Sequence, residues 1–593
     1  MNHILGYFSA TAEAGGFRAD FEASASACFE NETCKVMVSG DFRILADGHR
    51  YESVAGASEI AALYQQHGTE LFVRSGGNYS LAIFDKRERR LLVAVDGVGF
   101  GQVYYQVVAS EPASVVFSSS LAQLKKHPGV SASLSRQGLY NYFYFHVVPS
   151  PGTIYEGIRK LGPGQLLVAD ERAAEVKAYR ARDYREDTVT GFAALEEECR
   201  RIVRDCTARY AGLPDTGCFL SGGIDSSTIT AFHAMQSEKP IDTFSIGFDA
   251  PEYDESHYAE ITATKYATRH HRYDVTPANV LESIERIARA YDEPFGNASA
   301  VPAFYCAKLA RESGVTHMLA GDGGDEIFAG NERYQKQRIF ELYGRLPKLI
   351  RGGLVEPVVT RLEGRQRLFA KAASYVRQAN TPLPDRLEAY NFLHRESPES
   401  IFEADFLAAV NVDEPLGLKR GVYHGAKAST SLNRLLELDM KFTVADNDLR
   451  KVITMCELAG VQVHFPLLDD ALIDFAASVP SRYKLRGNKL RYFFKQSMRG
   501  ILHPQTLAKQ KHGFGLPFGL WLKDYKPLRD FAGDCLQSFK QRGIVRKSYI
   551  DFVWDMHQHR DAVYYGVMIW LIVVLETWLH HHQDAGESHH SSR

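Results

Sequence analysis

Near the middle of the chain, a short motif combines residue types that can bind phosphate: Leu220-Ser221-Gly222-Gly223-Ile224-Asp225-Ser226-Ser227. It follows an apolar run typical of a strand, residues 217–220, and precedes a predicted helix. Glycines let the backbone approach phosphate oxygens, N–H groups at a helix start face the anion, and serine hydroxyls can donate further hydrogen bonds. The motif therefore predicts a phosphate-binding loop, although a Gly-rich turn that only opens a structural helix would look similar.

The loop is not a Walker motif, because the pattern GxxxxGK[ST] is absent. Instead it resembles the pyrophosphate-binding loop of the N-type ATP pyrophosphatases, which hydrolyse ATP between its α- and β-phosphates. Five further motifs follow, and their order and spacing resemble the synthetase domain of the asparagine synthetase family. They are Thr243-Phe244-Ser245-Ile246-Gly247-Phe248-Asp249, Asp292-Glu293-Pro294-Phe295, Gly321-Asp322-Gly323-Gly324-Asp325-Glu326, Phe465-Pro466-Leu467-Leu468-Asp469 and Lys511-His512-Gly513-Phe514-Gly515-Leu516-Pro517.

Alternating strand and helix signals around the loop predict a parallel α/β sheet. The resemblance implies that residues 190–580 form an ATP-pyrophosphatase domain of the PP-loop, HUP-like type. Residues from Tyr334 to about Leu436 are rich in Arg and Leu and predict a helical insertion. Residues 581–593 are predicted to be a polar tail, and their histidines receive no metal-binding role.

The N-terminal half instead carries strand signals, at residues 35–38, 79–84 and 90–95. Its motifs Asp85-Lys86-Arg87 and Val95-Asp96-Gly97-Val98-Gly99 resemble the family's glutaminase domain. This resemblance implies an N-terminal-nucleophile hydrolase-like β-sandwich, of the type 2 glutamine amidotransferase kind, over residues 1–180. A change from strand to helix signals after the polar segment 181–190 predicts the domain boundary there.

The N-terminal half departs from the family where glutamine would be hydrolysed. A family glutaminase begins Met-Cys-Gly-Ile, and the exposed Cys acts as nucleophile with its own α-amine as base. Here the second residue is Asn2, whose amide cannot become an anion near neutral pH. Cys28 and Cys34 cannot lie at the chain terminus without processing and are predicted to be ordinary thiols. We therefore expect an inactive glutaminase domain.

The resemblance implies a reaction in two steps. A substrate carboxylate attacks the α-phosphorus of ATP, pyrophosphate leaves, and an amine then attacks the acyl-adenylate. Asp225 and Asp325 are the predicted Mg²⁺ ligands, since carboxylate and phosphate oxygens suit that ion, with helix capping as a compatible role for Asp225. The residues predicted to bind ATP are Leu220, Ser221, Gly222, Gly223, Asp225, Ser226, Ser227, Ile246, Ala320 and Gly321, although Leu220 and Ile246 would equally suit a core.

Three residues are predicted to act in catalysis. Asp322 stands where asparagine synthetases have Glu and β-lactam synthetases have Tyr, and is the predicted base or orienting group for the amine. The alternative is an Asp that only stabilises a Gly-rich turn. Arg491, or alternatively Lys489, aligns with the family's lysine that stabilises the activated intermediate. The family's Lys-Val-Asp-Arg-Met segment reads Lys451-Val452-Ile453-Thr454-Met455 here, so that substrate contacts are expected to differ.

Three functions remain open from the sequence. The first is an asparagine synthetase-like ligase that amidates aspartate or a related acid with ammonia. The second is a specialised amide, lactam or macrolactam synthetase, similar to the β-lactam synthetases and lasso-peptide cyclases, whose amine belongs to its substrate. The third is a noncatalytic degenerate scaffold, which the retained loop argues against. The cofactors are then ATP and Mg²⁺, and the partners are a small-molecule carboxylate and an amine or ammonia donor.

Bulk properties limit the remaining possibilities. The chain has 593 residues, 45% hydrophobic and 24% charged, as expected of a soluble multidomain protein. Its formal net charge of −3 argues against nucleic acid as a partner. Eight scattered cysteines and an N-terminus without a secretory signal predict a cytoplasmic protein. The most apolar stretch, 563–575, is shorter than the ~20 residues of a membrane span, so it predicts a buried helix and no membrane partner. A homodimer is a possible assembly.

Overall fold

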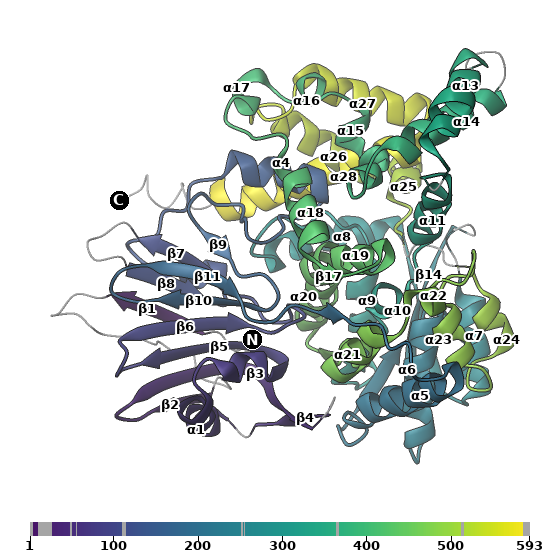
Figure 1. Cartoon of the computed structure of the whole chain (residues 1–593). Coiled ribbons are helices and arrows are strands. Elements are labelled where there is room, and N and C mark those ends of the chain that lie inside the picture. Colours follow the sequence, from purple (N-terminus) through teal and green to yellow (C-terminus); the bar gives the residue numbers. More distant parts are fainter. Residues whose placement is uncertain are drawn as a thin grey trace.

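The computed structural model describes residues 4–9, 27–47, 50–54, 56–108, 114–250, 253, 255–344, 346–362, 367–510 and 515–584. Strands dominate its N-terminal part, drawn in purple and blue, and helices dominate the rest (Figure 1). Two features singled out in the sequence, Asn2 and residues 511–514, lie outside the described residues.

The N-terminal part contains two antiparallel sheets. Their strand orders are β1-β8-β7-β9 and β11-β10-β6-β5-β3-β2, and β4 pairs with β3. The strands are β1 (Leu5–Ser9), β2 (Ala27–Glu30), β3 (Cys34–Asp47), β4 (Arg50–Ser53), β5 (Ser75–Asp85), β6 (Arg90–Val95), β7 (Tyr104–Val108), β8 (Ser114–Ser118), β9 (Arg159–Lys160), β10 (Gln165–Ala169) and β11 (Ala174–Ala178). The three strands predicted from the sequence fall within β3, β5 and β6, and these predictions are confirmed.

Both faces of the larger sheet are buried, as the side chains of β6 illustrate. Leu91 and Val93 pack in one hydrophobic cluster with Val115 and Phe117 of the smaller sheet. Leu92, their neighbour, belongs to a second cluster with helix α1 (Ala57–His67). Because successive side chains of a strand point to opposite faces, an unbroken apolar run here serves both layers. The predicted β-sandwich is therefore confirmed, with α1 covering its outer face.

The C-terminal part is built on a parallel sheet in the order β15-β14-β13-β16-β18. Its strands are β13 (Thr216–Phe219), β14 (Asp242–Phe248), β15 (Arg269–Val275), β16 (His317–Leu319) and β18 (Gln462–His464). Helices α5 (Phe192–Ala208), α6 (Ile224–Gln236), α7 (Ser256–Lys265), α8 (Pro277–Ala290) and α9 (Ala300–Glu312) precede or link them. In such a sheet, the loops after neighbouring strands meet at one edge and form the usual ligand site.

The predicted insertion is largely helical. It contains α11 (Glu332–Gly344), α12 (Lys348–Ile350), α13 (Glu356–Leu362), α14 (Arg367–Asn380), α15 (Phe392–Arg395), α16 (Pro398–Ile401), α17 (Ala404–Leu407) and α18 (Glu414–Gly425), and α19 (Ser431–Asp439) begins within it. The predicted buried helix is also present as α28 (Ala562–Leu579). The helical stretch Ala562–Asp584 is long and apolar enough to cross a membrane, but 72% of its most apolar 18-residue segment is buried inside the protein, as in a core helix.

Buried ion pairs join the N-terminal sheet to helix α21 (Asp470–Ser478). The Arg43 guanidinium on β3 lies 2.7 Å from the Asp469 carboxylate, which caps that helix. Arg180 lies 2.9 Å from the Asp470 carboxylate, which also accepts a 2.6 Å hydrogen bond from the Gly77 N–H on β5. The N-terminal part is therefore fixed to the helix that directly follows the predicted Phe465-Pro466-Leu467-Leu468-Asp469 motif.

Replacing Arg180 with Met is expected to lower the free energy of unfolding by about 3 kcal/mol, because it leaves Asp470 buried without its cation. Urea denaturation followed by circular dichroism measures this change. The double variant Arg180→Met with Asp470→Asn should recover part of the loss. As a matched control, Arg201→Met removes two exposed pairs, with Glu198 and Asp205, and should cost about 1 kcal/mol or less. Equal losses for the two Arg variants would contradict a structural role for the buried pair.

Candidate active site

The predicted phosphate loop connects β13 to the start of α6. The Ser221 N–H donates to the Ser226 Oγ at 3.2 Å, and the two hydroxyl oxygens lie 3.1 Å apart. Gly222 has a φ of +69°, and a Cβ there would lie 2.4 Å from the Tyr258 carbonyl carbon and from the Ala259 nitrogen. Only glycine therefore fits at this position. The loop is curled so that Ser221 and Ser226 both line a pocket at the N-terminus of α6.

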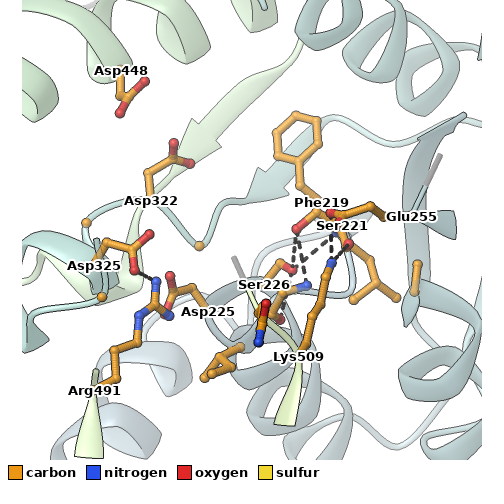
Figure 2. Close-up of a pocket in the computed structure, with 18 of the residues that line it drawn as sticks. Phe219, Ser221, Asp225, Ser226, Glu255, Asp322, Asp325, Asp448, Arg491 and Lys509 are labelled. Carbon is orange, nitrogen blue, oxygen red and sulfur yellow. Dashed lines mark hydrogen bonds and ion pairs between the residues drawn. The ribbon is translucent and has the colours of Figure 1, made fainter. Parts of the chain in front are cut away.

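A lysine that the sequence analysis did not select closes the other side of this loop. The Lys509 ammonium donates to the Ser221 carbonyl at 3.3 Å and lies 2.9 Å from the Glu255 carboxylate (Figure 2). Its side chain is almost wholly buried and lines the pocket. Lys509 stands two residues before the predicted motif at Lys511, which was the available signal. It adds positive charge where phosphate would bind.

Arg491 brings together the two carboxylates that were predicted to bind Mg²⁺. Its Nη1 lies 2.7 Å from the Asp225 Oδ1, and its Nη2 forms an ion pair with the Asp325 Oδ1 (Figure 2). Asp225 belongs to the first turn of α6 and Asp325 to the first turn of α10 (Gly324–Phe328). Lys489 lines the same pocket. The described residues contain no cluster of three or more His, Cys, Asp or Glu side chains suited to a metal ion.

Asp322 lies in the turn between β16 and α10, beside a second ion pair. Gly323, which follows it, has a φ of +95°, and a Cβ there would lie 2.2 Å from Leu468. The Lys451 ammonium lies 2.6 Å from the Asp448 carboxylate. Burial raises the pKa of Asp322 to about 6, opposed by the positive charge of Lys451 and helped by Asp448. Asp322 can therefore exchange a proton near neutral pH.

If Asp322 is the base, the rate of amide formation at saturating acid, ATP and free ammonia should rise with pH, pass its midpoint near pH 6 and level off at higher pH. The reason is that the carboxylate accepts a proton only when it is ionised, and its pKa lies near 6. Single-turnover formation of the amide between pH 5 and 8 measures the profile. An Asp322→Asn variant provides the control, since its residual rate should lose this inflection. The same inflection in both proteins would assign the titration to another group.

The predicted site residues divide into those that line the pocket and those that do not. The pocket, of about 1020 Å³, is lined by Leu220, Ser221, Gly223, Asp225, Ser226, Ile246, Gly321, Asp322, Asp325, Lys489 and Arg491. Gly222, Ser227 and Ala320 are not among its lining residues. Ser227 points into the core, where its Oγ accepts a 2.9 Å hydrogen bond from Thr262. Ala320 is buried in a hydrophobic cluster, and Gly222 has no side chain to offer.

Two family models match the chain. A family model described as asparagine synthase matches residues 198–580, and one described as a glutamine amidotransferase domain matches residues 42–180. The fold and these matches define the class as ATP-dependent amide ligases with an attached amidotransferase-like domain. The chain belongs to the asparagine synthase family. The N-terminal-nucleophile hydrolase-like fold predicted for the first half is confirmed by the amidotransferase match.

Several curated proteins are similar over much of the chain. Asparagine synthetase [glutamine-hydrolyzing] 1 of Bacillus subtilis is 23% identical over 561 residues, covering 93% of this chain and 86% of that protein. Putative asparagine synthetase [glutamine-hydrolyzing] 2 of Methanocaldococcus jannaschii is 31% identical over 318 residues, or 52% of this chain and 60% of that protein. A putative asparagine synthetase [glutamine-hydrolyzing] of Mycobacterium tuberculosis is 25% identical over 531 residues, with 88% and 78% covered.

Proposed function

We propose that this chain activates aspartate or a related acid with ATP and couples it to ammonia, releasing AMP and pyrophosphate. One observation carries the proposal. The phosphate loop, the paired Asp225 and Arg491, and the carboxylate of Asp322 all line one pocket at the carboxyl ends of parallel strands. A reaction that cleaves ATP and then moves a proton from an amine requires these groups together.

In the first step, a carboxylate oxygen of the substrate attacks the α-phosphorus, and the bond to the bridging oxygen of pyrophosphate breaks. The N–H groups at the start of α6 and the hydroxyls of Ser221 and Ser226 would donate to the phosphates. Lys509 and Arg491 would offset the negative charge that builds up on the leaving group. Arg491 remains charged at all working pH values and would hold the intermediate without acting as a base.

Mg²⁺ fits this pocket as a partner of ATP. The described residues supply two carboxylates, Asp225 and Asp325, and Mg²⁺ is commonly held by one or two carboxylates together with substrate phosphates. When bound there, the ion would neutralise phosphate charge. Both carboxylates contact Arg491, so that the same guanidinium would orient them.

In the second step, the amine nitrogen attacks the acyl carbon and AMP leaves with the electrons of the broken C–O bond. The nitrogen must lose a proton, and Asp322 would accept it. Lys451 and Asp448, which form an ion pair close by, would set the charge around Asp322. Asp322 is then a catalytic residue of the second step only.

The ammonia is proposed to come from outside the chain. Asn2 offers no thiolate, and burial raises the pKa of both Cys28 and Cys34, which makes them poorer nucleophiles. Asn2→Ala is therefore expected to leave every rate unchanged. Steady-state amide formation with ammonia and, separately, with glutamine measures this, and glutamine-dependent activity that is lost in the variant would contradict the proposal.

The function is tested by pyrophosphate release from ATP and Mg²⁺ with aspartate as the acid, using ammonia and glutamine separately as nitrogen donors. We expect aspartate-dependent release, and amide product with ammonia but not with glutamine. Product formation from glutamine would overturn the inactive-glutaminase proposal. Absence of release with either donor would exclude aspartate as the acid.

A second candidate is a specialised synthetase whose acid or amine is larger than aspartate or ammonia. The pocket volume of about 1020 Å³ supports this candidate, because that volume is at the upper end of the range for small-molecule sites. Acid-dependent pyrophosphate release with larger carboxylates, and none with aspartate, would favour this candidate.

A further inference from the structure

An aliphatic surface is concentrated on one arm of the molecule. Six of the 15 exposed large hydrophobic side chains of the described residues fall between positions 342 and 358. Leu349 is 88% exposed and Leu354 is 67% exposed. We call these six the aliphatic tip: Leu342, Leu346, Leu349, Ile350, Leu354 and Val358. They lie on α11, α12, the π-helical segment Arg351–Val355, α13 and the turn before α12, and α13 and α14 stand out from the body at the upper right of Figure 1.

The same arm is strongly basic. Residues 332–380 contain eleven Lys and Arg against four Asp and Glu, a local net charge of +7 in a chain of −3. Arg333 and Arg338 face inward, where Arg333 pairs with Asp439 and Arg338 donates to a backbone carbonyl. Others are exposed, among them Arg361 on α13 and Lys371 on α14. Exposed aliphatic side chains and exposed cations therefore share one protruding arm.

We propose that this arm is a docking surface for an anionic lipid membrane. Aliphatic side chains on a basic helical segment are suited to enter the headgroup boundary while Lys and Arg contact anionic lipids. Tyr343 lies among these aliphatic residues on α11, with Arg351 over its ring, and an amphipathic aromatic side chain of this kind is also suited to the headgroup boundary. The local net charge of +7 is complementary to an anionic lipid surface. The expectation of no membrane partner rested on the apolar stretch 563–575 being too short to span a bilayer, which does not bear on docking at a membrane surface.

The pocket lies at the base of the arm. Glu332, the first residue of α11, lines the pocket, and the tip begins at Leu342 further along the same helix. The proposal does not rest on the proposed reaction, because charge and exposure alone carry it. Its consequence is that substrates would reach the pocket close to a membrane surface.

Vesicle flotation tests the proposal with the full-length chain. Vesicles of phosphatidylcholine alone are compared with vesicles of equal parts phosphatidylcholine and phosphatidylglycerol, at low and high salt. The chain should float with the anionic vesicles only, and high salt should weaken binding. Leu349→Glu with Leu354→Glu, and separately Arg361→Glu with Lys371→Glu, should each lower the partition coefficient by about tenfold or more.

Matched controls replace exposed residues elsewhere. Val189→Glu, at a 94% exposed position, and Lys126→Glu should bind vesicles like the unmodified chain. All variants should keep the melting temperature of the unmodified chain, since the replaced side chains are exposed. Equal binding to both vesicle types, or unchanged binding of the tip variant, would overturn the proposal. A tip variant that changes the oligomeric mass without affecting flotation would instead assign the arm to protein contacts, and would equally overturn it.

Discussion

Replacing Asp322 with Asn will slow amide formation by about 10²-fold to 10⁴-fold while leaving carboxylate activation in place. The amide side chain keeps the shape of Asp322 but cannot accept a proton from the amine. The pKa of about 6 makes the native carboxylate suited to that transfer near neutral pH. Carboxylate-dependent exchange of labelled pyrophosphate into ATP measures the first step, and amide product measures the second.

The control for this variant addresses the alternative that Asp322 only stabilises a turn. Asp170 lies in an exposed turn between β10 and β11, and it accepts hydrogen bonds from the backbone N–H groups of Arg172 and Ala173. It does not line the pocket. Asp170→Asn should change neither step. If Asp322→Asn reduced both steps equally and lowered the melting temperature, Asp322 would be a structural residue.

Replacing Asp225 with Ala is expected to reduce both steps, by at least about 10²-fold to 10³-fold. Asp225 lies at the start of α6, where phosphate would bind, and its carboxylate holds the Arg491 guanidinium at 2.7 Å. Without it, Arg491 would keep only its pairing with Asp325, and the proposed Mg²⁺ site would lose a ligand. The assays are the same pyrophosphate exchange and amide formation.

If Asp225 only capped helix α6, its removal would lower the stability of the protein and leave catalysis largely intact. Gly223 is the N-cap residue of α6, and no side chain caps that helix. Removing Asp225 should therefore cost about 1 kcal/mol or less from the helix dipole, because the buried Arg491 guanidinium keeps Asp325 as its partner. Asp205→Ala, which removes an exposed carboxylate on α5, is the matched control and should retain full activity. Retained pyrophosphate exchange in Asp225→Ala would contradict the proposed role of Asp225 in binding ATP and Mg²⁺.

Local patterns in the sequence predicted much of the fold. The strands β3, β5 and β6 follow from short apolar runs between turn residues, and β13 with the loop after it follows from an apolar run ending in glycines. The position of α28 follows from its unbroken apolar run. These features depend on neighbouring residues, which a sequence displays directly.

Contacts between distant residues could not be predicted in this way. The pairing of Arg180 with Asp470 and of Lys509 with Glu255 joins residues far apart in the chain, and no local pattern encodes it. Ser227 was predicted to bind ATP because it ends the motif, yet the helical turn directs it toward Thr262. On a helix, adjacent positions such as Ser226 and Ser227 point in different directions.

The central claim is that a carboxylate is activated by transfer of AMP from ATP. Aspartate labelled with ¹⁸O in its carboxylates tests this directly, with ammonia, ATP and Mg²⁺ present and the products read by mass spectrometry. Attack on the α-phosphorus predicts that one ¹⁸O atom appears in AMP for each amide formed, and none in inorganic phosphate or pyrophosphate. Label in inorganic phosphate, with ADP as the nucleotide product, would contradict the account.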